Sequence, residues 1–317
     1  MKLFVSRPLP DAVLERARAH FDMVHRTETL PMSQAECVAA LEGYDIVLPT
    51  LGDLYRAETF AAAKDMRCRM LANFGVGYNH IDVAAACAAG IAVTNTPGAV
   101  TDATADIALT LILMSARRAA EGERLVRAGQ WAGWHPTQML GLHVTGKTVA
   151  IIGMGRIGKA IARRCHHGFG MEVVFFNRSP VADPGVPARQ VPTLHAAMAA
   201  ADIVVVAVPG GAETRHLIDA TAIGAMRPHA HLVNIARGDV VEEAALIAAL
   251  EGGQIGGAGL DVYEREPVVP EALVRLDNVT LLPHLGTAAL EVRTAMGMMA
   301  LDNAIAFAEG RDLPNAV

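Results

Sequence analysis

Short runs of consecutive apolar residues alternate along this chain with longer segments in which apolar residues recur every three or four positions. An uninterrupted apolar run suits a parallel strand that is buried on both faces, whereas the longer recurrence is typical of a helix that packs on one side. The alternation predicts an α/β fold of parallel sheets with helices on both faces. Strands are expected at residues 3–5, 23–24, 46–48, 70–73, 91–94, 147–152, 172–176, 203–208, 231–235, 258–262 and 279–282, and the main helices at 11–21, 34–41, 56–63, 83–89, 103–128, 159–169, 242–250 and 287–308.

The segment 147–179 organises the second half of the chain. An apolar run is followed directly by Gly153, Gly155 and Gly158, then by a helical segment and a second apolar run. This is the dinucleotide-binding pattern G-x-G-x-x-G in its proper setting, between a strand and a helix. Gly153 would permit a tight turn, Gly155 a close approach of backbone to a pyrophosphate, and Gly158 close packing of helix on strand. The alternative is a glycine-rich turn that binds no ligand.

Length and composition narrow the class of protein. With 317 residues, of which 52% are hydrophobic and 19% charged, the chain is long enough for two domains with sizeable cores. A net charge of −6 with scattered Lys and Arg argues against a nucleic-acid partner. The four cysteines show no CxxC spacing. We expect no metal site, no signal peptide and no membrane span, hence a reduced, cytoplasmic protein.

A single long helix is predicted over residues 103–128, because apolar residues recur there at helical spacing after credible N-cap residues. We expect it to be largely buried and to join two domains. The irregular segment that follows it carries both tryptophans of the chain, Trp131 and Trp134. Such an apolar segment belongs either to the core or to a subunit interface.

Three polar residues follow expected strand ends, namely Arg237, Glu266 and His284. The carboxyl ends of parallel strands meet at one edge of a sheet, so these residues are expected to lie together. Reduction of a 2-keto acid needs a cation for the carboxylate and ketone, a proton donor that titrates near neutrality, and a carboxylate to orient that donor. Each residue alone also has a structural interpretation: a surface salt bridge, a loop charge and a core histidine.

The first half of the chain contains a loop at residues 74–80 that directly follows an expected strand and holds two glycines. Exposed backbone N–H groups in such a loop can cradle an anion. A plain tight turn is the alternative.

Five segments together carry a resemblance to one family; they are residues 73–82, 153–158, 234–238, 259–267 and 283–286. With them, the chain resembles the D-isomer-specific 2-hydroxyacid dehydrogenases over essentially its whole length. The stretch 133–141 adds a closer similarity to the glyoxylate/hydroxypyruvate reductases of that family. The resemblance implies reduction of a small 2-keto acid, such as glyoxylate or hydroxypyruvate, to the D-2-hydroxy acid by a nicotinamide cofactor.

The resemblance also implies two Rossmann-like domains, the first of which is discontinuous. Residues 1–98 plus 287–317 would form a flavodoxin-like substrate domain, and residues 99–286 the dinucleotide-binding domain. The long helix and the tryptophan segment would build a homodimer interface, from which Trp134 would reach the active site of the partner subunit.

Individual residues acquire roles from the same resemblance. Arg237 would bind the substrate carboxylate and carbonyl, His284 would be the acid–base group, and Glu266 its partner. The backbone N–H groups of Val76 and Gly77 would bind the carboxylate. Leu51, Val76, Gly77, Trp134, Arg237 and His284 make up the expected substrate site. Thr104, Gly153, Gly155, Arg156, Ile157, Gly158, Asn177, Arg178, Ser179, Val208, Pro209, Thr214, Ile235, Ala236, Asp261, His284 and Gly286 make up the expected cofactor site.

The end of the second strand of the dinucleotide unit departs from the usual NAD pattern. An acidic residue commonly stands there to bind the ribose hydroxyls, whereas this chain has Asn177, Arg178 and Ser179. An uncharged Asn does not repel a 2′-phosphate, and Arg178 can donate to it. The three residues favour NADP(H), with NAD(H) as a possible cofactor, unless Arg178 is only a surface residue of a turn.

Two other functions remain open at this point. The chain can carry out the same chemistry on a different 2-keto acid, lactate-like or larger, because the side-chain pocket depends on loop positions such as Leu51 and Met139. It can also be a dinucleotide-sensing scaffold, like the corepressors that share this fold. The complete set of Arg237, Glu266 and His284 argues against the scaffold.

Overall fold

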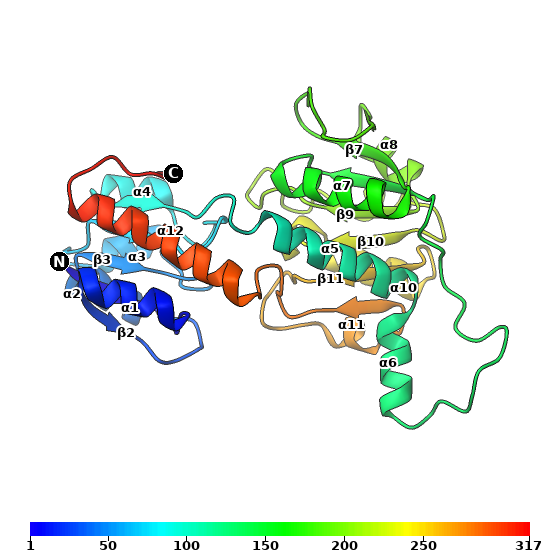
Figure 1. Ribbon diagram of the computed structural model, residues 1–317, viewed down its shortest axis with the longest axis horizontal. Coiled ribbons are helices and arrows are strands. Elements are labelled where there is room, and N and C mark those ends of the chain that lie inside the picture. The colour runs from blue at the N-terminus through cyan, green and yellow to red at the C-terminus, as the bar shows by residue number, and fades with distance from the viewer. The chain divides into compact units, whose positions relative to one another are not determined.

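The computed structural model describes residues 1–317, which divide into two units (Figure 1). The first unit comprises Met1–Val100 and Ala288–Val317, and the second unit comprises Thr101–Thr287. The expected divisions lay after residues 98 and 286. Each unit contains one all-parallel sheet between layers of helices, so the predicted fold class is confirmed.

The first unit is built on a five-stranded sheet in the order β2-β1-β3-β4-β5. Alternate strand residues enter two cores: α1 and α12 cover one face of the sheet, and α2, α3 and α4 cover the other. Glycine lets α12 lie close to α1, since a Cβ on Gly297 would come within 2.5 Å of Val13. The elements are β1 (Lys2–Val5), α1 (Asp11–His20), β2 (Asp22–His25), α2 (Gln34–Gly43), β3 (Ile46–Leu48), α3 (Ala57–Ala62), β4 (Met70–Ala72), α4 (Val83–Ala88), β5 (Ala92–Thr94) and α12 (Leu290–Ala308).

The second unit is built on a seven-stranded sheet in the order β12-β11-β10-β9-β6-β7-β8. Its elements are α5 (Thr101–Ala116), α6 (Ala119–Arg127), β6 (Thr148–Ile152), α7 (Arg156–Phe169), β7 (Glu172–Phe176), β8 (Ala188–Gln190), α8 (Leu194–Ala200), β9 (Ile203–Val206), α9 (Ala220–Gly224), β10 (His231–Asn234), a 3₁₀ turn (Gly238–Val240), α10 (Glu243–Glu251), β11 (Gly257–Leu260), α11 (Glu271–Arg275) and β12 (Val279–Leu281).

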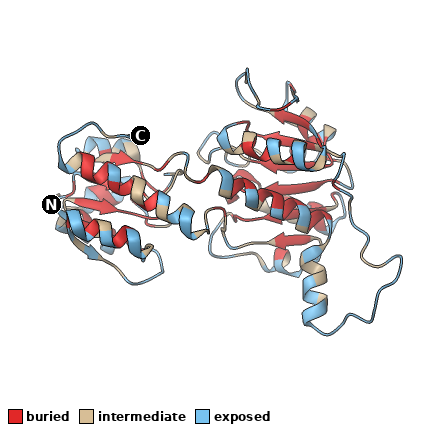
Figure 2. Cartoon of the chain, viewed as in Figure 1, coloured by how far each residue is buried: buried red, intermediate tan, exposed pale blue.

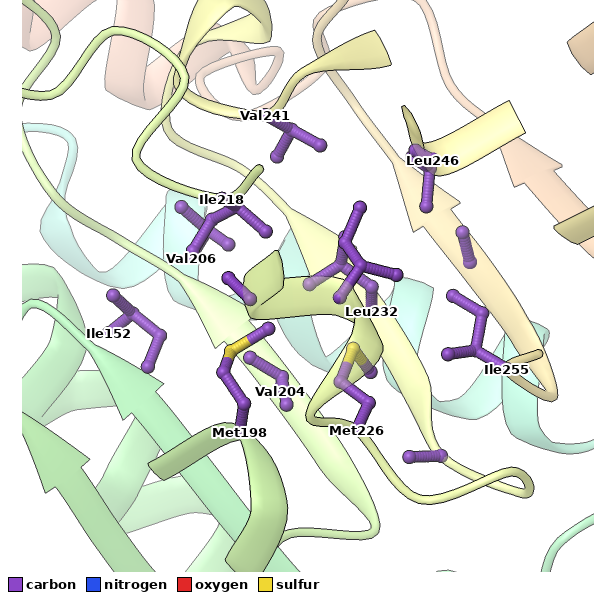
Figure 3. Packing of buried hydrophobic residues seen from close by; sticks show 14 of the residues in the cluster. Ile152, Met198, Val204, Val206, Ile218, Met226, Leu232, Val241, Leu246 and Ile255 are labelled. Carbon is purple, nitrogen blue, oxygen red and sulfur yellow. The ribbon is translucent and has the colours of Figure 1, made fainter. Parts of the chain in front are cut away.

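Both faces of this sheet are buried, which explains why its strands are continuously apolar (Figure 2). Along β6, Val149 and Ile151 pack under α5 and α7, whereas Ala150 and Ile152 face the opposite core. Figure 3 shows that opposite core, where Met198 of α8 and Met226 meet residues of the central strands.

The prediction of one long helix over residues 103–128 is wrong in one respect, because this segment forms two helices, α5 and α6. Arg118, at the break, has a left-handed backbone with φ of 54°. The Ala116 carbonyl accepts a hydrogen bond from Leu142 N–H at 2.7 Å, so it does not continue the helical ladder. Gly141 permits this contact, since a Cβ there would lie 2.4 Å from the Ala116 oxygen. A partner this distant in sequence leaves no trace in local periodicity.

The core interpretation of the tryptophan segment is also wrong for the single chain. Trp131 is 53% exposed and Trp134 is 78% exposed. No residue of α6 is buried (Figure 2).

No helix in either unit has both the length and the hydrophobicity needed to cross a bilayer.

Candidate functional site

The glycine loop lies at the carboxyl end of β6. Gly153 has a φ of 101°, and a Cβ there would lie 2.8 Å from the Val208 backbone nitrogen, so only glycine fits without displacement of the neighbouring loop. Gly158 lies in the first turn of α7, where a Cβ would lie 2.2 Å from the Gly153 oxygen. The two glycines thus bring the start of α7 directly against the end of the strand.

The N-terminus of α7 is open to a ligand. Gly155 is its N-cap and is exposed, and nothing lies within 4 Å of an ideal Cβ at this position. The helix runs for 14 residues, so its first N–H groups and its dipole favour an anion at this end. Arg156 is exposed and Ile157 is partly buried in the first turn. These features fit the pyrophosphate of a dinucleotide, which Gly155, Arg156 and Ile157 would hold.

The turn after β7 is held by the side chain that replaces the usual acid. Asn177 Oδ1 accepts a hydrogen bond from Met154 N–H at 3.3 Å, and its Nδ2 donates to the Ser179 carbonyl at 3.0 Å. Asn177 therefore ties the glycine loop to the turn. Arg178 projects from the turn with 85% of its side chain exposed, and it forms an ion pair with Glu213 from the loop after β9. That pair was not anticipated from sequence.

The remaining predicted cofactor residues lie at the same edge of the sheet. Thr214 Oγ1 donates to the Pro209 carbonyl at 2.7 Å, which closes the loop after β9, next to Val208. Ile235 and Ala236 are buried directly after β10. Hydrogen bonds join Gly286 to both Thr104 and Asp261.

Arg237 follows β10 in a turn that Asn234 organises. Asn234 Nδ2 donates to the Arg237 carbonyl at 2.9 Å, and Asn234 Oδ1 accepts from Ala236 N–H at 3.0 Å. The Arg237 guanidinium donates to the Ala236 carbonyl at 2.7 Å. Burial lowers the pKa of Arg237, and the nearby carboxylates of Glu266 and Asp239 oppose this effect. The result is a partly buried cation that its own turn holds in place.

Glycine brings the Arg237 turn against the loop that carries Glu266. A Cβ on Gly238 would lie 1.8 Å from the Tyr263 carbonyl carbon and 2.3 Å from the Glu264 nitrogen. Both are backbone atoms, so no side-chain rotation relieves the clash. Glu266 Oε1 in turn accepts a hydrogen bond from Tyr263 N–H at 3.1 Å.

His284 and Glu266 form a hydrogen-bonded pair. His284 Nδ1 lies 2.8 Å from Glu266 Oε2, and each side chain is about one-third exposed (30% and 31%). Burial alone would raise the pKa of Glu266, but the hydrogen bond and charge of His284, with Arg237 nearby, hold that pKa below its ordinary value. Glu266 is therefore an ionised acceptor, so His284 donates from Nδ1 and keeps Nε2 for another partner.

Asp261, expected only in the cofactor site, also organises the turn that carries His284. Its carboxylate accepts from Leu285 N–H at 2.6 Å and from Gly286 N–H at 2.8 Å, and its carbonyl accepts from His284 N–H at 2.9 Å. Burial raises the pKa of Asp261, an effect that these N–H donors and His284 oppose. Thr104 Oγ1 donates to the Gly286 carbonyl at 3.1 Å. Asp261 and Thr104 therefore fix the turn on which His284 lies.

Two groups of predicted site residues do not lie at this edge of the seven-stranded sheet. Leu51, Val76 and Gly77 belong to the first unit, where Leu51 is 38% exposed in the turn after β3 and the two others are partly buried in the loop after β4. Trp134 lies in the exposed segment that follows α6, and the second unit places no other site residue on that segment.

Comparisons with known proteins agree on one family. The sequence profile of the D-isomer specific 2-hydroxyacid dehydrogenase NAD-binding domain matches residues 109–286. The glyoxylate reductase of Thermococcus kodakarensis is 41% identical over 322 residues, which cover 100% of this chain and 96% of that protein. An NADPH-dependent glyoxylate/hydroxypyruvate reductase from Sinorhizobium meliloti, solved with NADP and malonate, is 36% identical with a TM-score of 0.88 over 100% of this chain and 96% of that one. A glyoxylate reductase from Paecilomyes thermophila is 30% identical, also with a TM-score of 0.88, over 100% and 98% of the chains.

The close packing of Gly238 leads to a stability prediction. Gly238→Ala should lower the free energy of unfolding by about 3 kcal/mol or more, because backbone must move to admit the methyl group. Gly168→Ala is the matched control: nothing lies within 4 Å of an ideal Cβ at this position of α7, so alanine should raise stability by up to about 1 kcal/mol. Urea unfolding of both variants measures the difference, and equal stability of the two would contradict the packing argument.

Proposed function

The chain belongs to the D-isomer specific 2-hydroxyacid dehydrogenase family, and we propose that it reduces a small 2-keto acid, glyoxylate or hydroxypyruvate, to the D-2-hydroxy acid with NADPH or NADH. The observation that carries the proposal is the His284–Glu266 pair, with Arg237 close enough to lower the pKa of Glu266. This set lies at the sheet edge that also holds the glycine loop. In this proposal the first unit is the substrate domain and the second unit the dinucleotide-binding domain.

Arg237 would bind the substrate. Its guanidinium can donate in parallel to a carboxylate oxygen and to the neighbouring keto oxygen, which withdraws electron density from the carbonyl carbon. The N–H groups of Val76 and Gly77, in the first unit, would also donate to the substrate carboxylate. Leu51 would contact the substrate side chain, and its size would favour a short one.

His284 would supply the proton. When bound, a reduced nicotinamide supplies a hydride to the carbonyl carbon. His284 gives a proton from Nε2 to the carbonyl oxygen, so the ketone becomes a hydroxyl and the imidazole ends neutral. Glu266 accepts from Nδ1 throughout, which fixes the ring and stabilises its charged form before transfer. Asp261 and Thr104 hold the turn beneath the imidazole.

Initial rates with NADPH and NADH against a panel of 2-keto acids test this function. Glyoxylate and hydroxypyruvate should have the highest kcat/KM. Higher values with pyruvate or with larger or aromatic keto acids would support a different 2-hydroxyacid dehydrogenase. Dinucleotide binding without turnover of any substrate would support the corepressor-like scaffold instead.

We also propose that NADPH is the preferred cofactor. Arg178 is an exposed cation in the turn after β7, where a 2′-phosphate would lie, and the Asn177 amide adds no negative charge to that turn. Glu213 forms an ion pair with Arg178, so a 2′-phosphate would have to displace the Glu213 carboxylate from the guanidinium. The exposed α6 and the tryptophan segment support a homodimer, in which the two tryptophans would be covered by the partner subunit.

Replacement of Arg237 by lysine should separate charge from geometry. Arg237→Lys keeps a cation but loses the two-pronged donor, so kcat/KM for glyoxylate should fall at least ~100-fold. Arg275→Lys is a matched control that should retain wild-type kinetics, because Arg275 is an exposed residue of α11 that pairs with Glu271. Wild-type kcat/KM in Arg237→Lys would exclude Arg237 from the site.

The pH profile tests the His284–Glu266 pair. Because the pKa of Glu266 is lowered, its carboxylate stays charged at pH values below the ordinary pKa of a glutamate. Throughout the neutral range the charged carboxylate therefore favours the protonated imidazole. Glu266→Gln removes that charge, and the alkaline limb of kcat/KM for reduction should move down by about 1 pH unit. Glu264→Gln is the matched control, because Glu264 pairs with a different histidine, His216, at 2.7 Å. A limb that stays in place in Glu266→Gln would show that Glu266 does not act on His284.

Cofactor preference should respond to both members of the Arg178–Glu213 pair. Arg178→Ala should reduce the preference for NADPH by at least about tenfold, since a charged hydrogen bond to phosphate is lost, and leave NADH nearly unchanged. Glu213→Gln should lower KM for NADPH, because the phosphate no longer competes with a carboxylate for Arg178. Measured kcat/KM values for both cofactors decide the point, and an equal loss for NADPH and NADH in Arg178→Ala would identify an ordinary surface arginine.

A further inference from the structure

The loop of residues 74–80 in the first unit, here called the carboxylate loop, has its carbonyl groups fixed by side-chain amides. The Gly75 carbonyl accepts from Thr96 N–H at 3.0 Å and from Asn73 Nδ2 at 3.1 Å. The Val76 carbonyl accepts from Asn95 Nδ2 at 2.9 Å. The Gly77 carbonyl accepts from Asn73 Nδ2 at 3.1 Å. Three successive peptide units are thus each anchored through the carbonyl oxygen.

Anchoring a carbonyl also sets the direction of the next N–H group. A trans peptide is planar, so the N–H of one residue points opposite to the carbonyl of the residue before it. The anchored Gly75 carbonyl therefore turns Val76 N–H away from Asn73, and the anchored Val76 carbonyl turns Gly77 N–H away from Asn95. Neither N–H has a hydrogen-bond partner in the chain. Both remain available to an anion.

Without such anchors this loop would have more backbone freedom. Glycine populates many backbone conformations, and Val76 lies between two glycines, Gly75 and Gly77. The anchors themselves are firmly held. Asn73 is fully buried, and its Oδ1 lies 3.0 Å from His80 Nε2, which must donate to it. Asn95 is partly buried, and its backbone N–H donates to Asn315 at 3.1 Å.

We propose that Asn73 and Asn95 are positioning residues that aim the Val76 and Gly77 N–H groups at the substrate carboxylate. The proposal rests on the function proposed above and adds residues to which neither the sequence nor the resemblance assigned a role. It also limits the substrate class: the ligand on this loop is an anion that accepts two backbone N–H groups side by side, which a free carboxylate does and an ester or primary amide does poorly.

The proposal predicts a particular kinetic change. The carboxylate keeps its charge between the bound substrate and the transition state, so the two N–H groups stabilise both states equally. Loss of their alignment should raise KM and leave kcat nearly unchanged. A residue that only supported the fold would instead lower thermal stability and the active fraction, which reduces kcat at constant KM.

Asn95→Ala is the first variant to test, because Asn95 is partly exposed and its side chain donates only to Val76. KM for glyoxylate should rise about tenfold, as expected when a hydrogen bond to a charged group is weakened. The Kd of NADPH and the Tm should match wild type. Asn73→Ala should raise KM further, though it also removes a buried amide. Asn79→Ala is the matched control, since this exposed asparagine lies in the same loop and its side chain makes no hydrogen bond.

The outcomes separate the two proposals. Turnover of 2-keto acids by the wild type with an unchanged KM in Asn95→Ala overturns the positioning role and leaves the proposed function standing. An equal rise in KM in Asn79→Ala and Asn95→Ala also overturns it, because the effect would then not depend on a carbonyl anchor. Absence of turnover by the wild type overturns the proposed function and this inference with it.

Discussion

The candidate site depends on the parallel register of the seven-stranded sheet. Asn234 of β10 is paired with Leu260 of β11, and Leu260 is paired with Leu281 of β12. All three strands run in the same direction, so the segments that leave them begin side by side at one edge. The Arg237 turn, the Glu266 loop and the His284 turn are those segments. Burial of both faces of the sheet fixes the register, because a slip by one residue would exchange the two cores.

Register alone brings these segments near one another, and short contacts between the loops hold them in place. Gly238 allows the backbone of the Arg237 turn to touch the backbone at Tyr263. Tyr263 Oη donates to the Leu282 carbonyl at 2.9 Å, and the Asp261 carboxylate accepts two N–H groups of the His284 turn. Hydrogen bonds from His284 and from Tyr263 N–H, together with the nearby Arg237, then outweigh the effect of burial on the pKa of the Glu266 carboxylate. Charge and backbone geometry thus act together on the imidazole.

Sequence reasoning predicted the fold class and the residues at the strand ends because both follow from local patterns. Continuous apolar strands, alternating helices and glycines at fixed spacing are all visible within short windows of the chain. It failed where a distant residue decides the structure. The break between α5 and α6 depends on a hydrogen bond from Leu142. Asp261 stabilises the His284 turn by accepting hydrogen bonds from N–H groups that follow a different strand. The packing of α12 on α1 through Gly297 is equally distant, which is why periodicity could not assign the C-terminal helix to the first unit. The catalytic and cofactor roles of the individual side chains remain predictions.

In the proposed function, Arg237 holds the 2-keto group in one orientation, so that a hydride from the nicotinamide would reach one face of the carbonyl carbon while His284 protonates the oxygen. The stereochemistry of the product is the most direct test of this orientation, since only a fixed orientation gives a single isomer. Hydroxypyruvate should be reduced with NADPH, and the product resolved by chiral chromatography. D-glycerate should be essentially the only product. Formation of L-glycerate, or of both isomers in comparable amounts, would show that the keto group is not held in the proposed orientation.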